Sequence, residues 1–123
     1  MILVDTSVWI SHLRRHNQQL DDLLDSELIF CHPLIIGEIS CGHLQNRSLI
    51  LSLFEELPQV STATHQEALI FIERHGLMGR GLSFIDIHLL ASCQIEDLTI
   101  WTQDKLLQRA AQVLHLNYHP LHH

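Results

Sequence analysis

The sequence predicts an α/β domain built on a mainly parallel sheet. Short apolar runs of strand length alternate with longer segments whose apolar residues recur at helical spacing. The first run, Ile2–Val4, contains no polar residue, which is typical of a strand covered by helices on both faces. At 123 residues, the chain fits one domain with a sizeable core.

The first half of the chain alternates two strands with four helices. We expect the strands at Ile2–Val4 and Leu28–Cys31, and the helices at Ser7–Arg15, Gln18–Asp25, Pro33–Leu44 and Arg47–Glu56. Asp5, Thr6 or Ser7 can cap the first helix, and Pro33 suits the first turn of the third. The second helix carries leucines on one face and, on the other, three aspartates that we expect to be solvated: Asp21, Asp22 and Asp25.

The second half begins with Thr64, which with Glu67 forms a capping-box pattern for a helix ending near His75. After a glycine-containing loop, Ser83 starts a helix through Ser92. The β-branched and aromatic run Leu98–Trp101 predicts a strand. A last helix then extends from Asp104 to Leu114, and two weak strands are expected at Gln59–Ser61 and Leu116–Tyr118.

The composition is acidic, with a formal net charge of −7 from 14 acids and 7 bases. A protein of this charge binds nucleic acid only through a local basic patch or bridging cations. The bases are scattered along the chain, at Arg14, Arg15, Arg47, Arg74, Arg80, Lys105 and Arg109. The hydrophobic content of 46% argues against a disordered chain.

Cysteine usage and the chain ends predict a cytoplasmic protein. The three cysteines, Cys31, Cys41 and Cys93, form no C-x-x-C pair and lie among apolar residues, so we expect buried hydrophobes rather than disulfides or a catalytic thiol. We expect no signal peptide and no membrane span. We interpret the last few residues, which include His119, His122 and His123, as a flexible His-rich tail of the kind that a purification tag leaves.

Four isolated acids stand out against their apolar neighbours. Asp5 and Asp104 each follow a predicted strand, whereas Glu38 and Asp86 lie inside apolar helices. Each has a structural explanation of its own: a helix cap for Asp5, a capping pair with Ser83 for Asp86, a helix-dipole position for Asp104 and an arginine partner for Glu38. The residues alone leave these explanations open.

A shared metal site explains all four acids at once. Carboxylates that converge at the carboxyl edge of a parallel sheet repel one another, and a divalent cation removes that repulsion. Oxygen ligands suit Mg²⁺ or Mn²⁺, and such a site can hydrolyse a phosphodiester. The hydroxyls of Thr6, Ser7 and Thr102 could contact a carboxylate or a water of the metal.

Four motifs in order resemble the PIN-domain family, and more narrowly the VapC-type toxin ribonucleases. They are Asp5-Thr6-Ser7, Glu38 with Gly42, Ser83-Phe84-Ile85-Asp86 with Leu90-Ala91, and Thr102-Gln103-Asp104-Lys105. The resemblance covers nearly the whole chain. It implies a three-layer α/β/α sandwich and an Mg²⁺-dependent endoribonuclease, the toxin of a type II toxin–antitoxin pair, which cleaves RNA with a metal-activated water.

The resemblance also implies roles for individual residues. Asp5, Glu38, Asp86 and Asp104 match the family's acidic quartet, which holds the metal and is catalytic, and Ser7 and Thr102 match its accessory hydroxyls. Gln103 departs from the basic residue that many relatives have, which weakens any inference about RNA contacts there. We expect His88 to face away from the quartet. Candidate RNA-backbone contacts are Arg14, Arg15, Arg80, Lys105 and Arg109.

The partners that the resemblance implies are RNA, a cognate antitoxin and a second copy of the chain. The antitoxin would insert a basic side chain among the acids and an apolar segment into a groove, for which residues 20–24 and 49–57 are candidate walls or ordinary core. A phosphoacceptor receiver domain is disfavoured because Lys105 lies inside the last helix. A non-catalytic PIN-like interaction or RNA-binding module is the stronger alternative.

Overall fold

The computed structural model describes residues 1–120 and contains a three-stranded parallel sheet in the order β2-β1-β3. The central strand β1 (Ile2–Val4) pairs with β2 (Ile29–Phe30) and with β3 (Thr99–Trp101). The predicted α/β fold with a parallel sheet is therefore confirmed. The part of the predicted tail at residues 121–123, with His122 and His123, lies outside the described residues.

Single backbone bridges extend the sheet at both edges. Gln59 pairs with Cys31, and Asn117 pairs with Ile100, both in parallel. The Val60 N–H donates to the Cys31 carbonyl at 2.9 Å, and the Tyr118 N–H donates to the Ile100 carbonyl at the same distance. Each of the two weak strands predicted at Gln59–Ser61 and Leu116–Tyr118 is therefore a single bridge and not a strand.

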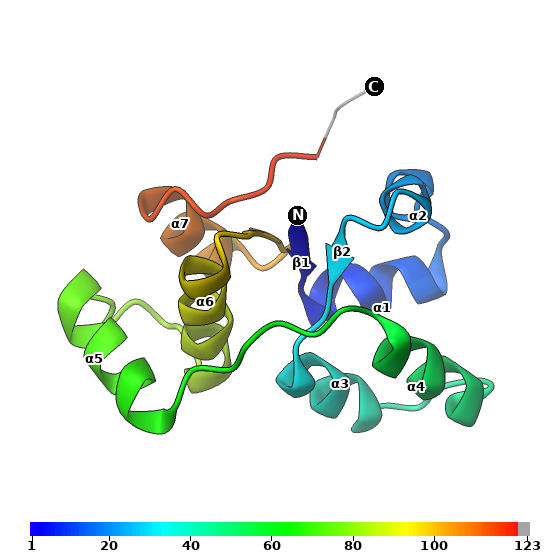
Figure 1. Ribbon diagram of the computed structural model, residues 1–123, viewed down its shortest axis with the longest axis horizontal. Coiled ribbons are helices and arrows are strands. Elements are labelled where there is room, and N and C mark those ends of the chain that lie inside the picture. Colours follow the sequence, from blue (N-terminus) through cyan, green and yellow to red (C-terminus); the bar gives the residue numbers. More distant parts are fainter. Residues whose placement is uncertain (121–123) are drawn as a thin grey trace.

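Helices cover both faces of the sheet, as the predicted three-layer sandwich requires. Figure 1 shows α1 to α4 on one side of the strands and α5 to α7 on the other. Their bounds are α1 Thr6–Arg14, α2 Gln18–Asp25, α3 Pro33–Ser40, α4 Arg47–Glu56, α5 His65–His75, α6 Phe84–Glu96 and α7 Lys105–Val113.

The strand order explains this division of the helices. From β1 the chain moves outward to β2 and Gln59, then returns past β1 to β3 on the other side. Right-handed crossovers in opposite directions place their helices on opposite faces. The direction changes between β1 and β3, and the carboxyl ends of strands at such a switch point form the crevice where α/β proteins bind ligands.

Helix ends follow local sequence signals, with one clear departure. Thr64 and Ser83 form capping boxes at the starts of α5 and α6. However, α3 ends at Ser40 rather than at the predicted Leu44. The Arg47 guanidinium donates to the Ser40 carbonyl at 2.6 Å and to the Gly42 carbonyl at 3.1 Å, so a side chain from α4 satisfies carbonyls left unpaired at this helix end.

The core lies between the sheet and its two helical layers. Leu3, Val4 and Ile100 from the strands are fully buried. Burial also raises the pKa of the Cys31 thiol to about 11 and of the Cys93 thiol to about 12, so both are buried hydrophobes as predicted. Cys41 is exposed beyond the end of α3, where the same prediction was wrong. No helix of residues 1–120 is both long and apolar enough to cross a membrane.

Truncating the central strand should destabilise the whole domain. Leu3 is fully buried in β1, so Leu3→Ala should lower the free energy of unfolding by about 2–5 kcal/mol through lost burial and a residual cavity. Urea denaturation followed by circular dichroism measures this change. The matched control is Leu49→Ala, because Leu49 is 59% exposed and should change stability little. If Leu3→Ala and Leu49→Ala lower the free energy of unfolding equally, the core does not lie where the structure places it.

Candidate active site

Asp5 is the buried acid at the end of the central strand. Its N–H donates to the Trp101 carbonyl at 2.9 Å, and the residue is 7% exposed. The carboxylate atom Oδ2 accepts from Ser7 Oγ at 2.8 Å and from Thr102 Oγ1 at 2.7 Å. Asp5 occupies the N-cap position of α1, but its side chain makes no capping hydrogen bond. Its carboxylate therefore does not cap the helix and is held instead at the end of the sheet by Ser7 and Thr102.

Thr102 links Asp5 to the acid at the end of β3. Its buried hydroxyl donates to Asp5 and accepts from the Asp104 N–H at 3.0 Å. Asp104 in turn caps α7, because its Oδ1 accepts from Leu106 N at 2.9 Å and Leu107 N at 3.1 Å. The helix-end explanation for Asp104 is therefore confirmed, and it leaves the second carboxylate oxygen available.

Glu38 and Asp86 come from helices in the two opposite layers. Glu38 in α3 accepts from Thr6 Oγ1 at 2.8 Å through its Oε1. Asp86 in α6 accepts from the Ser83 N–H at 3.0 Å through its Oδ2, which confirms the predicted capping pair. The arginine partner that we considered for Glu38 is not observed. Its hydrogen-bond partner is the neutral hydroxyl of Thr6.

The acids are close enough to repel one another. Burial raises the pKa of the Glu38 carboxyl; the Thr6 hydrogen bond lowers it, and the charges of Asp5 and Asp86 raise it further. Burial likewise raises the pKa of Asp86, opposed by its hydrogen bonds to Ser83 and assisted by the charges of Asp5 and Asp104. The structure thus brings all four predicted acids to one edge of the sheet.

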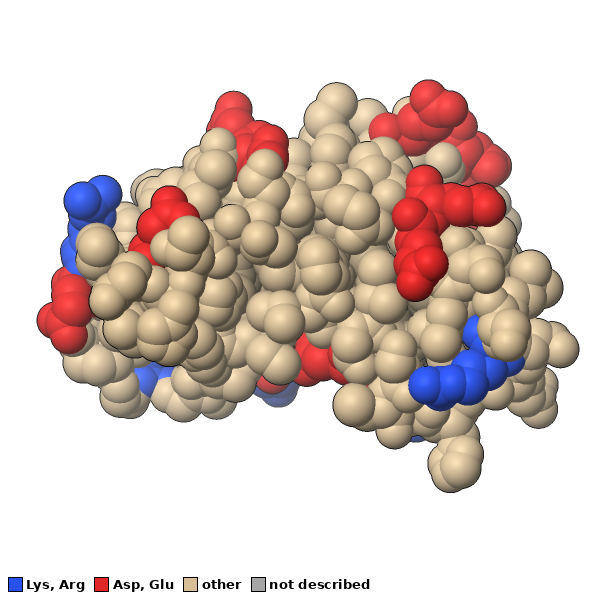
Figure 2. Space-filling model, turned by 60° about the horizontal axis from the view of Figure 1, so that its bottom comes forward, with Lys and Arg blue, Asp and Glu red and all other residues tan. Residues whose placement is uncertain are grey.

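No basic side chain within residues 1–120 neutralises this charge through an ion pair. The salt bridges in this range involve Asp21 with two histidines, and none involves the four acids. Figure 2 shows the basic side chains of one face as separate small patches. An anionic cluster without a cationic partner is unfavourable, so the arrangement favours a bound cation.

Each of the four carboxylates is held by one oxygen only. The protein donors described above use Asp5 Oδ2, Glu38 Oε1, Asp86 Oδ2 and Asp104 Oδ1. Within residues 1–120 the second oxygen of each accepts no hydrogen bond from the protein. The donors therefore fix the orientation of the carboxylates and leave one oxygen of each for a cation or its waters.

This donor set fits Mg²⁺ or Mn²⁺. No three of the four acids have ligand atoms that all lie within 4.8 Å of one another, so the site is not a closed cage of protein ligands. Mg²⁺ usually keeps several waters and binds through one or two carboxylates. A buried Asp5 as direct ligand, with the other acids contacting the ion or its waters, matches that preference.

A second cluster, His12, His16 and Asp21, has ligand atoms within 4.8 Å of one another. His16 Nε2 contacts Asp21 Oδ2, and His12 Nε2 lies 3.6 Å from Asp21 Oδ1. The Asn17 N–H donates to His12 Nδ1 at 3.0 Å, so the neutral ring carries its proton on Nε2 and has no lone pair there for a metal. The cluster thus links α1 to α2 by polar contacts. Asp22 and Asp25 are exposed as predicted, whereas the Asp21 side chain is 31% exposed and contacts both histidines.

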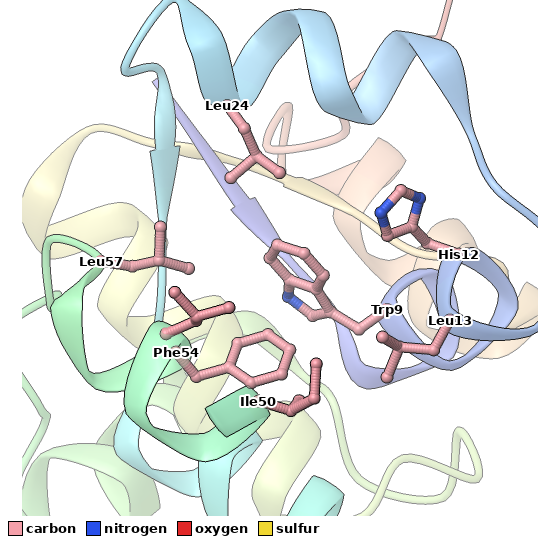
Figure 3. A pocket seen from close by; sticks show the side chains of 8 residues that line it. Trp9, His12, Leu13, Leu24, Ile50, Phe54 and Leu57 are labelled. Carbon is pink, nitrogen blue, oxygen red and sulfur yellow. The ribbon is translucent and has the colours of Figure 1, made fainter. Parts of the chain in front are cut away.

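An apolar pocket lies apart from the four acids, between α1, α2 and α4. Figure 3 shows Trp9, Leu24 and Phe54 facing one another across it. The rings of Trp9 and Phe54 meet edge to face, with centroids 4.7 Å apart. Its other lining residues are His12, Leu13, Ile50, Leu53 and Leu57. Both predicted groove segments, residues 20–24 and 49–57, contribute side chains to it.

Comparison with known proteins identifies the family. The family model described as "PIN domain" matches residues 2–113. This chain belongs to the PIN-domain family. Ribonuclease VapC32 of Mycobacterium tuberculosis, in two strains, is 43% identical over 111 residues, which span 89% of this chain and 90% of the relative. The predicted resemblance to VapC-type PIN domains is therefore confirmed.

Solved structures share the fold of this PIN domain at low sequence identity. PAE2754 from Pyrobaculum aerophilum is 18% identical with a TM-score of 0.65, over 92% of this chain and 90% of that one. FitAcB from Neisseria gonorrhoeae is 21% identical with a TM-score of 0.62, over 91% and 94%. These similarities support the three-layer architecture of this PIN domain.

The raised pKa values predict that removing charge stabilises the metal-free PIN domain. Because the pKa of Asp86 is raised in the folded state, ionisation of this carboxyl costs stability at neutral pH. The cost disappears as the pH falls through the raised pKa toward the ordinary value of 3.8. Asp86→Asn keeps an acceptor for Ser83. In the presence of a chelator, this variant should have a higher melting temperature than the parent at neutral pH. At a pH near the ordinary pKa of the carboxyl, the two melting temperatures should be equal.

Thermal denaturation at several pH values in chelator measures this difference. Glu38→Gln should behave in the same way, since its pKa is also raised. Asp25→Asn is the matched control, because Asp25 is an exposed acid of α2 and its charge does not contact the quartet. If Asp86→Asn melts at a lower temperature than the parent at neutral pH, the four carboxylates do not repel one another as described.

Proposed function

We propose that this chain is an Mg²⁺- or Mn²⁺-dependent endoribonuclease, the toxin of a type II toxin–antitoxin system. The observation that carries the proposal is the set of four convergent carboxylates, each oriented through one oxygen by a neutral donor and none paired with a base. The name of its relative, Ribonuclease VapC32, supports RNA as the substrate.

The chain's own residues divide the work of the site. Asp5, Glu38, Asp86 and Asp104 are the metal ligands and catalytic residues. Ser7 and Thr102 are accessory residues that hold the Asp5 carboxylate. A cation bound there would polarise the scissile phosphate and lower the pKa of an attacking water. No histidine or serine nucleophile is needed for this chemistry.

The four acids and the apolar pocket suggest how an antitoxin would bind. A cognate antitoxin places a basic side chain among the four acids and an apolar segment in the pocket of Figure 3. The toxin acts as a homodimer in the cytoplasm, and residues 1–123 act as one domain. Because the chain has a net charge of −7, RNA binding depends on the bound cation as much as on basic side chains.

Removing the charge of the buried acid should abolish catalysis. Asp5→Asn keeps an acceptor for Ser7 and Thr102 and removes the charge that attracts the cation. We expect Mg²⁺-dependent cleavage of total RNA to fall by about 100-fold or more, since even outer-shell partners of metal sites are worth about 10–100-fold. Gel electrophoresis of RNA incubated with the purified protein measures the loss.

The controls separate an enzyme from a non-catalytic module. Asp25→Asn should cleave RNA as the parent does, and a chelator should stop RNA cleavage by both proteins. Calorimetry should detect Mn²⁺ binding to the parent and little binding to Asp5→Asn. Full cleavage by Asp5→Asn, or a parent that binds neither metal nor RNA, would overturn the proposal in favour of a scaffold.

The apolar pocket should control inhibition and not cleavage. Leu53 lines the pocket and is 50% exposed, so Leu53→Glu should leave RNA cleavage intact. It should weaken inhibition by the product of the adjacent reading frame by about 30-fold, as the loss of a central interface contact does. Leu69→Glu, at a 40%-exposed leucine of α5 outside the pocket, should be inhibited normally. Equal inhibition of both variants would place the antitoxin elsewhere.

A further inference from the structure

A second open pocket lies between α5 and α6, in the helical layer opposite to α1 and α4 (Figure 1). Two large apolar side chains at this pocket remain in solvent, because Ile70 is 54% exposed and Ile95 is 53% exposed. The other lining residues that matter are Glu67, Phe71 and Arg74 of α5 and Ala91 of α6. We call these six residues the α5–α6 face.

The two exposed isoleucines form one patch and not two isolated contacts with water. Ile70 comes from α5 and Ile95 from α6, and both line the same pocket beside the buried side chains of Phe71 and Ala91. Single exposed apolar residues are ordinary on a protein surface, whereas neighbouring ones that surround a hollow mark a site of interaction. The α5–α6 face therefore has the character of a docking surface.

Opposite charges stand at the two ends of this face on α5. Glu67 and Arg74 are seven residues apart, which is two helical turns, so they lie on the same side of α5 and about 10.5 Å apart along its axis. This separation is too long for an ion pair within one chain, and neither residue forms a salt bridge within residues 1–120. Ile70 and Phe71 lie halfway between the two charges.

This order of charged and apolar residues is complementary to itself. In a two-fold symmetric interface, each residue that contacts a second residue of the partner is matched by the reverse contact. Two antiparallel α5 helices, related by an axis midway between Ile70 and Phe71, place Glu67 opposite the partner's Arg74. The same axis brings Ile70 over the partner's pocket. Two ion pairs then fix the register, and the apolar side chains supply the burial.

A second copy at the α5–α6 face leaves the other two sites open. The apolar pocket of Figure 3 belongs to the opposite helical layer, and Asp86 lies nine residues before Ile95 in α6, about 13 Å along the helix. The charges of Glu67 and Arg74 also cancel. The face thus brings no net charge into contact, although the chain as a whole carries −7 and repels its copies.

We propose that the α5–α6 face is the surface through which two copies of this chain associate, with antiparallel α5 helices at its centre. The inference rests on the homodimer of the proposed function and names the interface and its register. The four acids and the apolar pocket of each copy remain available to RNA and to the antitoxin.

The first test measures the mass of the purified protein, without antitoxin, by sedimentation velocity over a dilution series. Ile70→Glu places a charge in the interface from both subunits, so the dissociation constant of the dimer should rise by about 100-fold or more. Leu69→Glu is the matched control. Leu69 is the neighbouring residue of the same helix and is 40% exposed, but it does not line the pocket, so this variant should dimerise as the parent does.

An exchange of charges tests the antiparallel register. Arg74→Glu should weaken the dimer by about tenfold or more because it sets acid against acid at both ends of the α5 pair. Combining it with Glu67→Lys restores opposite charges and should restore the dimer. Glu67 also accepts from the Thr64 N–H in the capping box, so thermal denaturation must show that the double variant is folded. Glu67→Gln keeps that acceptor, removes only the charge and should weaken the dimer on its own.

Each contrary result has its own meaning. A folded Ile70→Glu that dimerises as tightly as the parent would overturn the α5–α6 face, and a dimer lost only in Leu69→Glu would place the interface on the other side of α5. A folded double variant no tighter than Arg74→Glu would overturn the register. A parent that is monomeric at every concentration would overturn the homodimer of the proposed function, and this face with it. RNA cleavage is tested separately through Asp5→Asn.

Discussion

The repulsion among four carboxylates is the constraint on which the rest of the site depends. Asp5, Glu38, Asp86 and Asp104 lie at one edge of the sheet and are held there by hydroxyls and backbone N–H groups, not by bases. Neutral donors orient a carboxylate without cancelling its charge. The domain therefore keeps a strongly negative site at a cost to its own stability.

The fold makes this concentration of charge possible. The switch point brings the ends of β1 and β3 side by side, so Asp5 and Asp104 meet through a single hydroxyl, that of Thr102. The two helical layers contribute α3 and α6 from opposite sides of the sheet (Figure 1). These helices carry Glu38 and Asp86. No pair of these acids is close in sequence, and only the doubly covered sheet unites them.

Much of this architecture could be predicted from sequence because its signals are local. Apolar runs marked the strands, and Thr64 and Ser83 marked helix starts by the capping boxes that they form. What could not be predicted depends on distant partners. Carbonyls at the early end of α3 accept hydrogen bonds from Arg47 of α4, and Asp21 of α2 contacts His12 and His16 across the turn between α1 and α2. The partner of Glu38, Thr6, lies 32 residues away in the chain.

The edges of the sheet have a consequence for how the protein behaves in solution. Beyond β2 and β3, the sheet ends on each side in a single bridge, at Gln59 and at Asn117. Within residues 1–120, neither edge presents the long row of unpaired N–H and C=O groups that recruits strands from other molecules. The fold can thus carry exposed apolar side chains while its backbone gives little template for self-aggregation.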